Sequence, residues 1–383
     1  MRKVLLKSLP YLLLIILYLS VGEYFLFRIK ENIPITYIVD KQVNSKQEFY
    51  YGRSLFEDAL PIYKYKSLES RKPSVVALGQ SIIFNFRDFF FHPYESTFYN
   101  TGLMVKNIYD LEFFKEQIEN KIITKPDFMV IGVDYSFILK NNGLDKKEEL
   151  KNLVEDPVYN YKEHLRAIQE VYLKKDVREV PSVCLGLGKK GMGGNGYRKD
   201  GSFSYKWELE NFLKDSLHME GPSKEKLIAK THHYKLPMEK DMKKWNKLVQ
   251  VLKEYRDLGI EVVLYFPPAS DEFHQFAMKD PDFSKFWNQY MQLQRELEIQ
   301  GFDMIKFTTP SQIGLNDYYM NNADHPGDIL VAKQFYSYCK SEERKNKFVE
   351  KIDTAYLHKM INEAPNPLSF MLDTLVYGSR MSK

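Results

Sequence analysis

Segments typical of buried strands alternate with amphipathic helical segments along most of this chain. The strand segments are residues 75–78, 98–101, 128–133, 260–266 and 304–307, each rich in apolar residues. Helical spacing of apolar residues marks segments 105–118, 242–258 and 284–300, and a further helix begins near residue 328. Strands that alternate with helices in this way predict an α/β fold, in which right-handed crossovers cover both faces of a parallel sheet.

The first 30 residues predict a membrane anchor. Three cationic side chains, Arg2, Lys3 and Lys7, precede an apolar stretch at residues 9–27, and nineteen residues are just long enough to cross a bilayer as a helix. The leading cations favour an amino end in the cytoplasm, so the remainder of the chain would lie outside it. A cleaved signal peptide, with small residues at 20–22 for cleavage, is the alternative interpretation.

The pattern divides the chain into four parts. We expect an anchor at residues 1–30, a polar and aromatic lead-in or stalk at 31–72, the α/β domain at 73–342 and a helical tail at 343–383. An insertion at about 140–240 interrupts the domain, where charged helical segments and a glycine-rich piece break the alternation. The glycine-rich piece lies at 186–201, and its part 191–201 follows no strand and lacks the Gly-Lys-Ser/Thr ending of a phosphate-binding loop. It is expected to be a flexible loop in which Tyr197 and Arg198 could contact a glycan or anionic polymer.

Composition excludes several classes of function. A net charge of +4 over 383 residues gives no concentrated basic stripe, which argues against nucleic-acid binding. The two cysteines, Cys184 and Cys339, are far apart and have no histidine cluster nearby, so a zinc site is not expected and a single disulfide stays open. The pair His232 and His233 has no matching acid or thiol at ligand spacing. No cofactor and no metal are expected.

Polar residues follow the predicted strands at the edge where open α/β sheets bind ligands. Ser81 follows the first strand, Gly102 the second and Asp134 the third, and His325 lies just before the final helix. A serine nucleophile needs a base within hydrogen-bond reach and donors aimed at the developing oxyanion. Ser81, His325 and the N–H groups of Ser81 and Gly102 are therefore the candidates, although each residue taken alone is more often a helix cap.

These segments resemble the motifs of the SGNH (GDSL-like) hydrolase superfamily. Its Gly-Asp-Ser motif corresponds to residues 79–81, its Asn-x-Gly turn to 100–102, its Gly-x-Asn block to 132–134 and its Asp-x-x-His block to 322–325. The resemblance implies a flavodoxin-like three-layer αβα sandwich. It also implies Ser81 as nucleophile, His325 as base, Gly102 and position 134 in the oxyanion hole, and position 322 orienting the histidine.

Two positions depart from that family pattern. Asp134 stands where the family has an asparagine, and an ionised carboxylate accepts hydrogen bonds but donates none. Asn322 stands where the family has its acid, and an amide oxygen orients a histidine without stabilising imidazolium as a carboxylate does. Asp324 supplies a charge, although a residue next to the histidine is expected to be badly placed to reach its ring.

The expected fold, the amino-terminal anchor and the large insertion are similar to those of exported relatives that take part in O-acetylation of alginate or D-alanylation of teichoic acid, and altered motifs are easier to accept in such a protein than in a fast esterase. That resemblance implies O-acylation of a cell-surface polysaccharide or polymer, beside a membrane-bound O-acyltransferase. The alternatives are a catalytically degenerate binding or assembly protein of the cell envelope and a simple secreted esterase.

Overall fold

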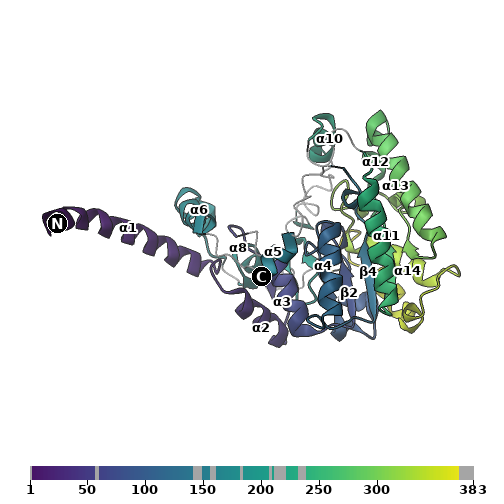
Figure 1. The fold of residues 1–383 in the computed structure, drawn as a ribbon, viewed down its shortest axis with the longest axis horizontal. Coiled ribbons are helices and arrows are strands. Elements are labelled where there is room, and N and C mark those ends of the chain that lie inside the picture. The colour runs from purple at the N-terminus through teal and green to yellow at the C-terminus, as the bar shows by residue number, and fades with distance from the viewer. Residues whose placement is uncertain are drawn as a thin grey trace.

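Five strands form the main sheet in the computed structural model (Figure 1). All neighbours in it are parallel, as predicted, and the strands lie in the order β3-β2-β4-β8-β9. Their bounds are β2 Val75–Leu78, β3 Phe98–Asn100, β4 Phe128–Gly132, β8 Glu261–Tyr265 and β9 Asp303–Ile305. The structure describes residues 2–56, 60–140, 149–155, 161–181, 184–206, 209–210, 221–231 and 239–370.

Successive residues of the central strands face two different hydrophobic cores. Val76 and Leu78 of β2 belong to one core, whereas Val75 and Ala77 belong to the other. The first core also contains side chains of α3 (Leu60–Arg71), α4 (Ile108–Glu119), α11 (Met242–Asp257) and α13 (Pro281–Ile299). The second contains side chains of α14 (Asp328–Lys340) and α15 (Thr354–Asn362). Burial on both faces explains why these strands are continuously apolar.

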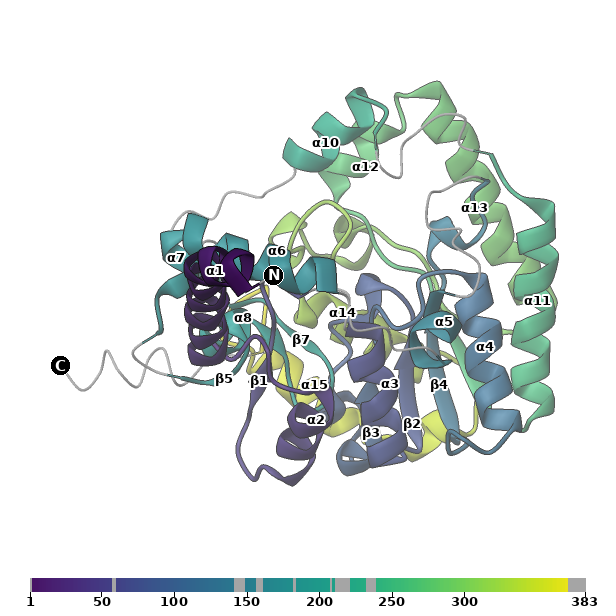
Figure 2. The ribbon, with the colours of Figure 1, turned by 60° about the vertical axis from the view of Figure 1, so that its left-hand side comes forward.

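The lead-in and the insertion together build a second, small sheet. Its strands lie in the order β5-β1-β6-β7, and β1 pairs parallel with β5 but antiparallel with β6. The bounds are β1 Tyr50–Tyr51, β5 Gly186–Leu187, β6 Gly196–Tyr197 and β7 Phe203–Ser204. Figure 2 shows these strands between α1 (Arg2–Arg28) and the main sheet. Segment 191–201, expected to be a flexible loop, contains β6, which pairs with β1 of the lead-in and with β7.

The remaining helices are short or lie at the periphery. They are α2 Ile35–Asn44, α5 Glu149–Glu155, α6 Tyr161–Leu173, α7 Lys175–Arg178, α8 Lys189–Met192, α10 Gly221–Ile228 and α12 Asp271–Ala277. Of the expected tail, the described part to residue 370 contains α15, whose Leu357 and Ile361 pack into the second core. The pair His232 and His233 lies outside the described residues. Cys184 and Cys339 are both free thiols.

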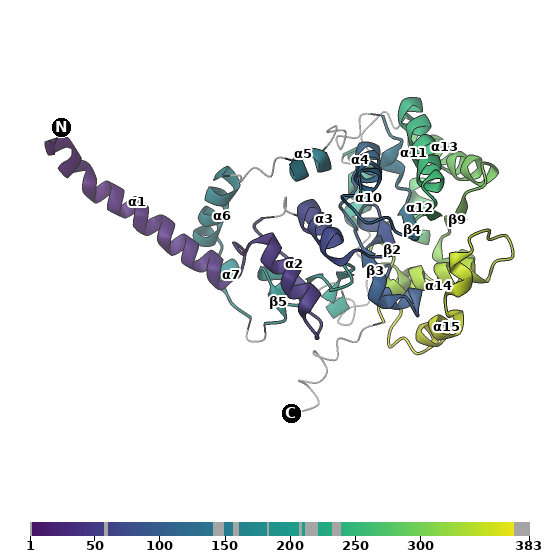
Figure 3. The same cartoon turned by 60° about the horizontal axis from the view of Figure 1, so that its bottom comes forward.

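The amino-terminal helix α1 projects from the body of the protein (Figures 1 and 3). Its stretch Lys7–Arg28 has a mean hydropathy of 1.8 and is only 11% buried, so it is long and apolar enough to cross a membrane. Near its end, Leu26 and Ile29 pack against Ala167 and Val171 of α6 and against Leu55.

Glu31, just beyond α1, connects this helix to the two segments that follow strands β1 and β5 of the small sheet. Its side chain is fully buried and accepts hydrogen bonds from the N–H groups of Ser54, Leu55 and Lys189, at 2.9, 3.0 and 2.8 Å. The three N–H groups satisfy a carboxylate that would otherwise be costly to bury. The base of α1 is therefore tied to the domain, and the lead-in is not a free stalk.

Candidate functional site

Ser81 occupies the turn that leaves the carboxyl end of β2. Gly79 has φ +154°, a conformation that other residues rarely adopt, and a Cβ there would lie 3.3–3.4 Å from the backbone of Gly132. The chain then enters a short 3₁₀ helix, Ser81–Ile83, whose apolar side chains Ile82 and Ile83 are buried. Gly79 allows the chain to turn sharply out of β2, and the two buried isoleucines fix this turn. Ser81 therefore lies at the carboxyl ends of the strands of the main sheet.

Asn100 holds this turn in place from the neighbouring strand. Its fully buried amide donates hydrogen bonds to the carbonyl oxygens of Ile83 and Phe86, at 2.6 and 3.0 Å. Its Oδ1 accepts from the N–H of Gly102 at 2.9 Å. A Cβ on Gly102 would lie 2.4 Å from the ring of Phe84, which explains the glycine. Asn100 is thus a positioning residue that the sequence analysis did not single out.

The loop before α14 brings His325 to Ser81. The Ser81 Oγ lies 2.8 Å from His325 Nε2. On the other side of the ring, Nδ1 lies 2.9 Å from Asp324 Oδ1 and 3.0 Å from Asn322 Oδ1. Nδ1–H donates to these oxygens in the tautomer that leaves Nε2 free to accept from Ser81. Contrary to expectation, Asp324 reaches the ring of the adjacent histidine.

The pKa of His325 is raised above its usual value. Burial alone would lower it, but the Asp324 carboxylate, close to the ring and hydrogen-bonded to Nδ1, outweighs burial, and Asp134 adds to the increase. These negative charges favour the imidazolium form. A base that becomes cationic when it takes a proton from a serine is stabilised by this arrangement.

Other expected site residues lie differently. The N–H of Gly102 is already used by Asn100, so the structure does not present it as an oxyanion donor. Asp134 is buried and lines a small cavity that Ser81 also lines. Tyr197 lines a second, larger cavity on another side of Ser81. Arg198 is only 3% exposed and lies over the ring of Tyr50.

Two spaces meet at the Ser81–His325 pair. The first, the enclosed chamber, has a volume of about 70 Å³ and is walled by Tyr135, Phe273, Phe283, Trp287 and Tyr290, with Asp134 and Asp324 at the polar end. The second, the open cleft, has a volume of about 510 Å³ and contains aromatic side chains and the cations Arg53, Lys106 and Lys190. Ser81 and His325 line both spaces. The aromatic wall has helical spacing on α13, which sequence alone could not distinguish from core.

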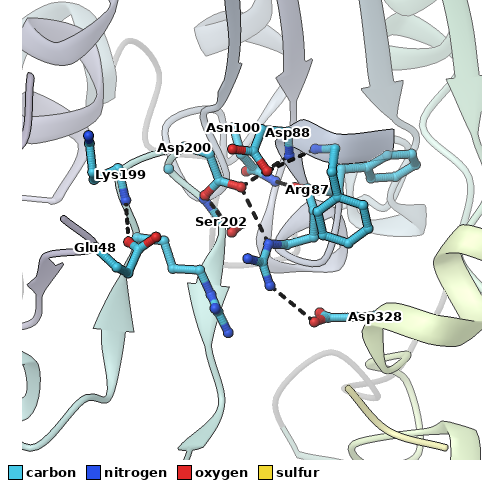
Figure 4. Close-up of polar contacts among 12 residues, drawn as sticks. Glu48, Arg87, Asp88, Asn100, Lys199, Asp200, Ser202 and Asp328 are labelled. Atoms are coloured by element: carbon cyan, nitrogen blue, oxygen red, sulfur yellow. Dashed lines mark hydrogen bonds and ion pairs between the residues drawn. The ribbon is translucent and has the colours of Figure 1, made fainter. Parts of the chain in front are cut away.

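A buried ionic cluster ties the serine loop to the histidine loop (Figure 4). Arg87 donates from Nε to Asp200 at 3.3 Å and from Nη1 to Asp328 at 3.2 Å, and all three side chains are at most 6% exposed. Asp328 begins α14, three residues after His325, and Asp200 lies in the turn between β6 and β7. Asn85 also donates to the carbonyl oxygen of Pro326. The serine loop, the histidine loop and the small sheet therefore share these polar contacts.

The pKa values in this cluster are shifted by burial and by mutual charge. Burial, followed by the Asp200 charge, raises the pKa of Asp88 to about 7. Burial also raises the pKa of Asp328. For Asp200, burial acts in the same direction, but Arg87 and the Ser202 hydroxyl outweigh it and lower the pKa. Asp200 is accordingly the carboxylate that holds its charge most firmly against Arg87.

Comparisons of the chain with family models, with curated proteins and with solved structures found no match. The residues that the structure describes also contain no group of three or more histidine, cysteine or acidic side chains arranged to hold a metal ion. The geometry around Ser81 and His325 is therefore what indicates a function.

The charge of Asp324 gives a pH-dependent prediction. If His325 acts as a general base it must be neutral, so the rate of an ester reaction should rise with pH through the pKa of this histidine. In Asp324→Asn, the main charge that raises this pKa is lost, and the acidic limb of the kcat/KM profile should move to lower pH. The plateau should fall about tenfold, because the imidazolium is less stabilised.

The profile can be measured with p-nitrophenyl acetate over about pH 5 to 9. Asn322→Asp is the matched variant, since it keeps the oxygen that accepts from the N–H groups of Asp324 and His325 but adds a charge beside Nδ1. Its acidic limb should move in the opposite direction. An unchanged limb in Asp324→Asn would show that this carboxylate does not control the base.

Proposed function

We propose that this protein is a membrane-anchored, extracytoplasmic SGNH-like O-acyltransferase that acts on a cell-surface polysaccharide or similar polymer. The observation that carries the proposal is the 2.8 Å contact between Ser81 Oγ and His325 Nε2, with a carboxylate on the opposite ring nitrogen. A nucleophile, a base and a group that orients the base are the parts that serine-based acyl chemistry requires.

The order of the main sheet supports the SGNH-like assignment. Counted along the chain, its strands lie in the order 2-1-3-4-5, which is the flavodoxin-like order of doubly wound sheets. Ligands bind such sheets outside the carboxyl ends of the strands, at the point where the strand order reverses. Ser81 leaves β2, the strand at which this reversal occurs, so its place in the fold agrees with its proposed role.

The chemistry follows from the two functions of His325. The Ser81 oxygen attacks the carbonyl carbon of an acyl ester or thioester while its proton passes to Nε2. When the tetrahedral intermediate collapses, the leaving oxygen or sulfur takes that proton and the acyl group remains on Ser81. An acceptor hydroxyl then attacks the acyl-serine, gives its proton to Nε2, and Ser81 leaves with the proton returned.

The Ser81 N–H is the oxyanion donor that the described residues support, since that of Gly102 is occupied. A single backbone donor predicts modest rates, because each lost oxyanion-hole donor typically costs about 10²–10³ in kcat. A modest rate is more acceptable for an enzyme that modifies a polymer held near it than for an esterase that acts on freely diffusing substrates.

The open cleft favours transfer over simple hydrolysis. Its lining includes Tyr51, Phe84 and Tyr197, which are mostly buried, and the half-buried Phe203, and their exposed parts give the cleft apolar surface that a sugar ring can contact. A volume of about 510 Å³ is in the range of pockets that hold one ligand of drug-like size, which is large enough for a short piece of a polysaccharide. The acyl donor would come from a membrane-bound O-acyltransferase, and α1 would keep the two proteins in the same membrane. The same residues could also carry out simple ester hydrolysis, in which water replaces the polymer hydroxyl as the acceptor, and this is the less favoured alternative.

An activity-based probe tests the proposal. A fluorophosphonate should form a covalent adduct with Ser81, which mass spectrometry of the digested protein can assign to the peptide that contains it. His325→Ala should abolish labelling because the serine loses its base, whereas His358→Ala, in the exposed face of α15, should label normally. Labelling that is absent in the folded protein would contradict the proposal.

A non-catalytic binding protein of the cell envelope is the second candidate. Two observations favour it: Asp134, an acceptor, occupies the chamber beside Ser81, and the Gly102 N–H is bonded within the protein. In that case the open cleft would hold a polymer without reaction. The absence of a Ser81 adduct, together with retained binding of a soluble polysaccharide, is the result that this candidate predicts.

A further inference from the structure

We infer that the enclosed chamber is the acyl subsite, that it admits only uncharged acyl groups of two or three carbons, and that Trp287 sets this limit. The inference rests on the proposed function and deepens it, because it names the group that Ser81 would carry. It follows from the volume of the chamber, from the packing of its wall and from the carboxylates at its polar end.

The position of Ser81 between two unequal spaces assigns each space a substrate. An ester bound at Ser81 has an acyl side and an alkoxy side, and both must be accommodated at once. A polymer fits the open cleft of about 510 Å³ but not the enclosed chamber of about 70 Å³. The acyl group therefore enters the chamber, and the oxygen of the leaving group or acceptor lies on the cleft side.

The volume of the chamber limits the length of the acyl chain. An engineered cavity of about 150 Å³ binds benzene, which has six heavy atoms. A space of about 70 Å³ is close to half of that and holds about three heavy atoms. An acetyl group has three heavy atoms and a propionyl group has four, so a butyryl or longer chain would have to displace the wall.

The wall of the chamber is too tightly packed to yield. Phe283, Trp287 and Tyr290 lie on one face of α13, and Trp287 is only 8% exposed. Its ring lies 5.6 Å from that of Phe283, 5.4 Å from Tyr290 and 4.8 Å from Phe307. Displacing a ring held on three sides would cost about 1–3 kcal/mol, as overpacking does in a core.

The charge in the chamber selects against acidic acyl groups. Asp134 and Asp324 both line it together with His274 and His325, and the lining residues include no lysine or arginine; Lys226, whose positive charge also acts on His325, is outside the lining. Both carboxylates act on His325 as negative charges, since each raises the pKa of this histidine. A dicarboxylic acyl group such as succinyl would bring a further negative charge into the same space and would be repelled.

A series of p-nitrophenyl esters tests the inference. We expect similar kcat/KM for acetate and propionate, then a fall of about tenfold or more at butyrate and again at hexanoate, once the rate of Ser81→Ala is subtracted. The hemisuccinate should be slower than the butyrate, which has a similar chain length and no charge. In Trp287→Leu, butyrate and hexanoate should gain about tenfold while acetate changes less than threefold.

Trp245→Leu is the matched control, because Trp245 is also buried in the same core, at 4% exposed against 8% for Trp287, but does not line the chamber. It should leave the ratio of butyrate to acetate unchanged, which separates the size of the chamber from general loosening. Equal rates across the series, with Ser81 still labelled by fluorophosphonate, would overturn the inference and leave the proposed function standing. If there were no Ser81-dependent turnover and no labelling of Ser81, both the inference and the proposed function would be contradicted.

Discussion

Ser81→Ala is expected to lower the turnover of p-nitrophenyl acetate by at least about 10³-fold, because loss of a serine nucleophile removes the covalent route. The free energy of unfolding should change by less than about 0.5 kcal/mol, since Ser81 is partly exposed and its described side-chain contact is the one with His325. The rates and a urea titration of the same preparation measure both quantities.

A control serine makes this result specific. Ser337 lies on α14 and is exposed, so Ser337→Ala should retain the full rate. Turnover by Ser81→Ala within about tenfold of the parent protein would indicate that another group carries the reaction. In that case the Ser81–His325 contact would be a structural hydrogen bond, and the binding function would become the better explanation.

Arg87→Met is expected to destabilise the protein by about 3–5 kcal/mol, the largest effect on folding that the structure predicts. Without the guanidinium, Asp200 and Asp328 would stay buried and lose their hydrogen-bonded cation, and Arg198, whose charge also acts on both carboxylates, would compensate only part of the loss. Breaking one member of a buried ionic network costs far more than the network contributes as a whole, because the remaining charges lose their compensation. Chemical denaturation at neutral pH gives the difference in the free energy of unfolding.

Two further variants provide comparisons for the stability of Arg87→Met. Arg87→Lys keeps the charge but not the planar fork, so it should lie between the parent protein and Arg87→Met. Lys66→Met removes a partly exposed pair with Glu69 and should cost less than about 1 kcal/mol. If Arg87→Met were no more harmful than Lys66→Met, the cluster would not hold the serine and histidine loops together.

The strands could be predicted from sequence because burial on both faces leaves an apolar run in each of them. Their parallel order also explains why Ser81 and His325, 244 positions apart, could be expected at one edge. Three features of the site could not be predicted. Asp324 reaches the neighbouring ring only because Asn322 folds the loop by accepting hydrogen bonds from two successive N–H groups, those of residues 324 and 325.

The other unpredicted features depend on contacts between distant segments. In the sequence, nothing distinguishes Arg87 from an arginine on the surface. Its partners Asp200 and Asp328 lie 113 and 241 positions away. The glycine-rich segment 186–201 looked like a loop because its strands are two residues long and pair with the lead-in. Local patterns do not record such pairings, so both features appear only in the folded chain.

The buried Glu31 has a mechanical consequence. A tether of free chain would let a catalytic domain sample a wide volume above a bilayer, but Glu31 joins the end of α1 to Ser54 and Leu55, and Phe56 next to them lines the open cleft. With α1 in a membrane, the cleft stands at a fixed height and in a fixed orientation. If the protein transfers acyl groups as proposed, it would then modify only those hydroxyl groups of a polymer that pass through one narrow layer near the lipid surface.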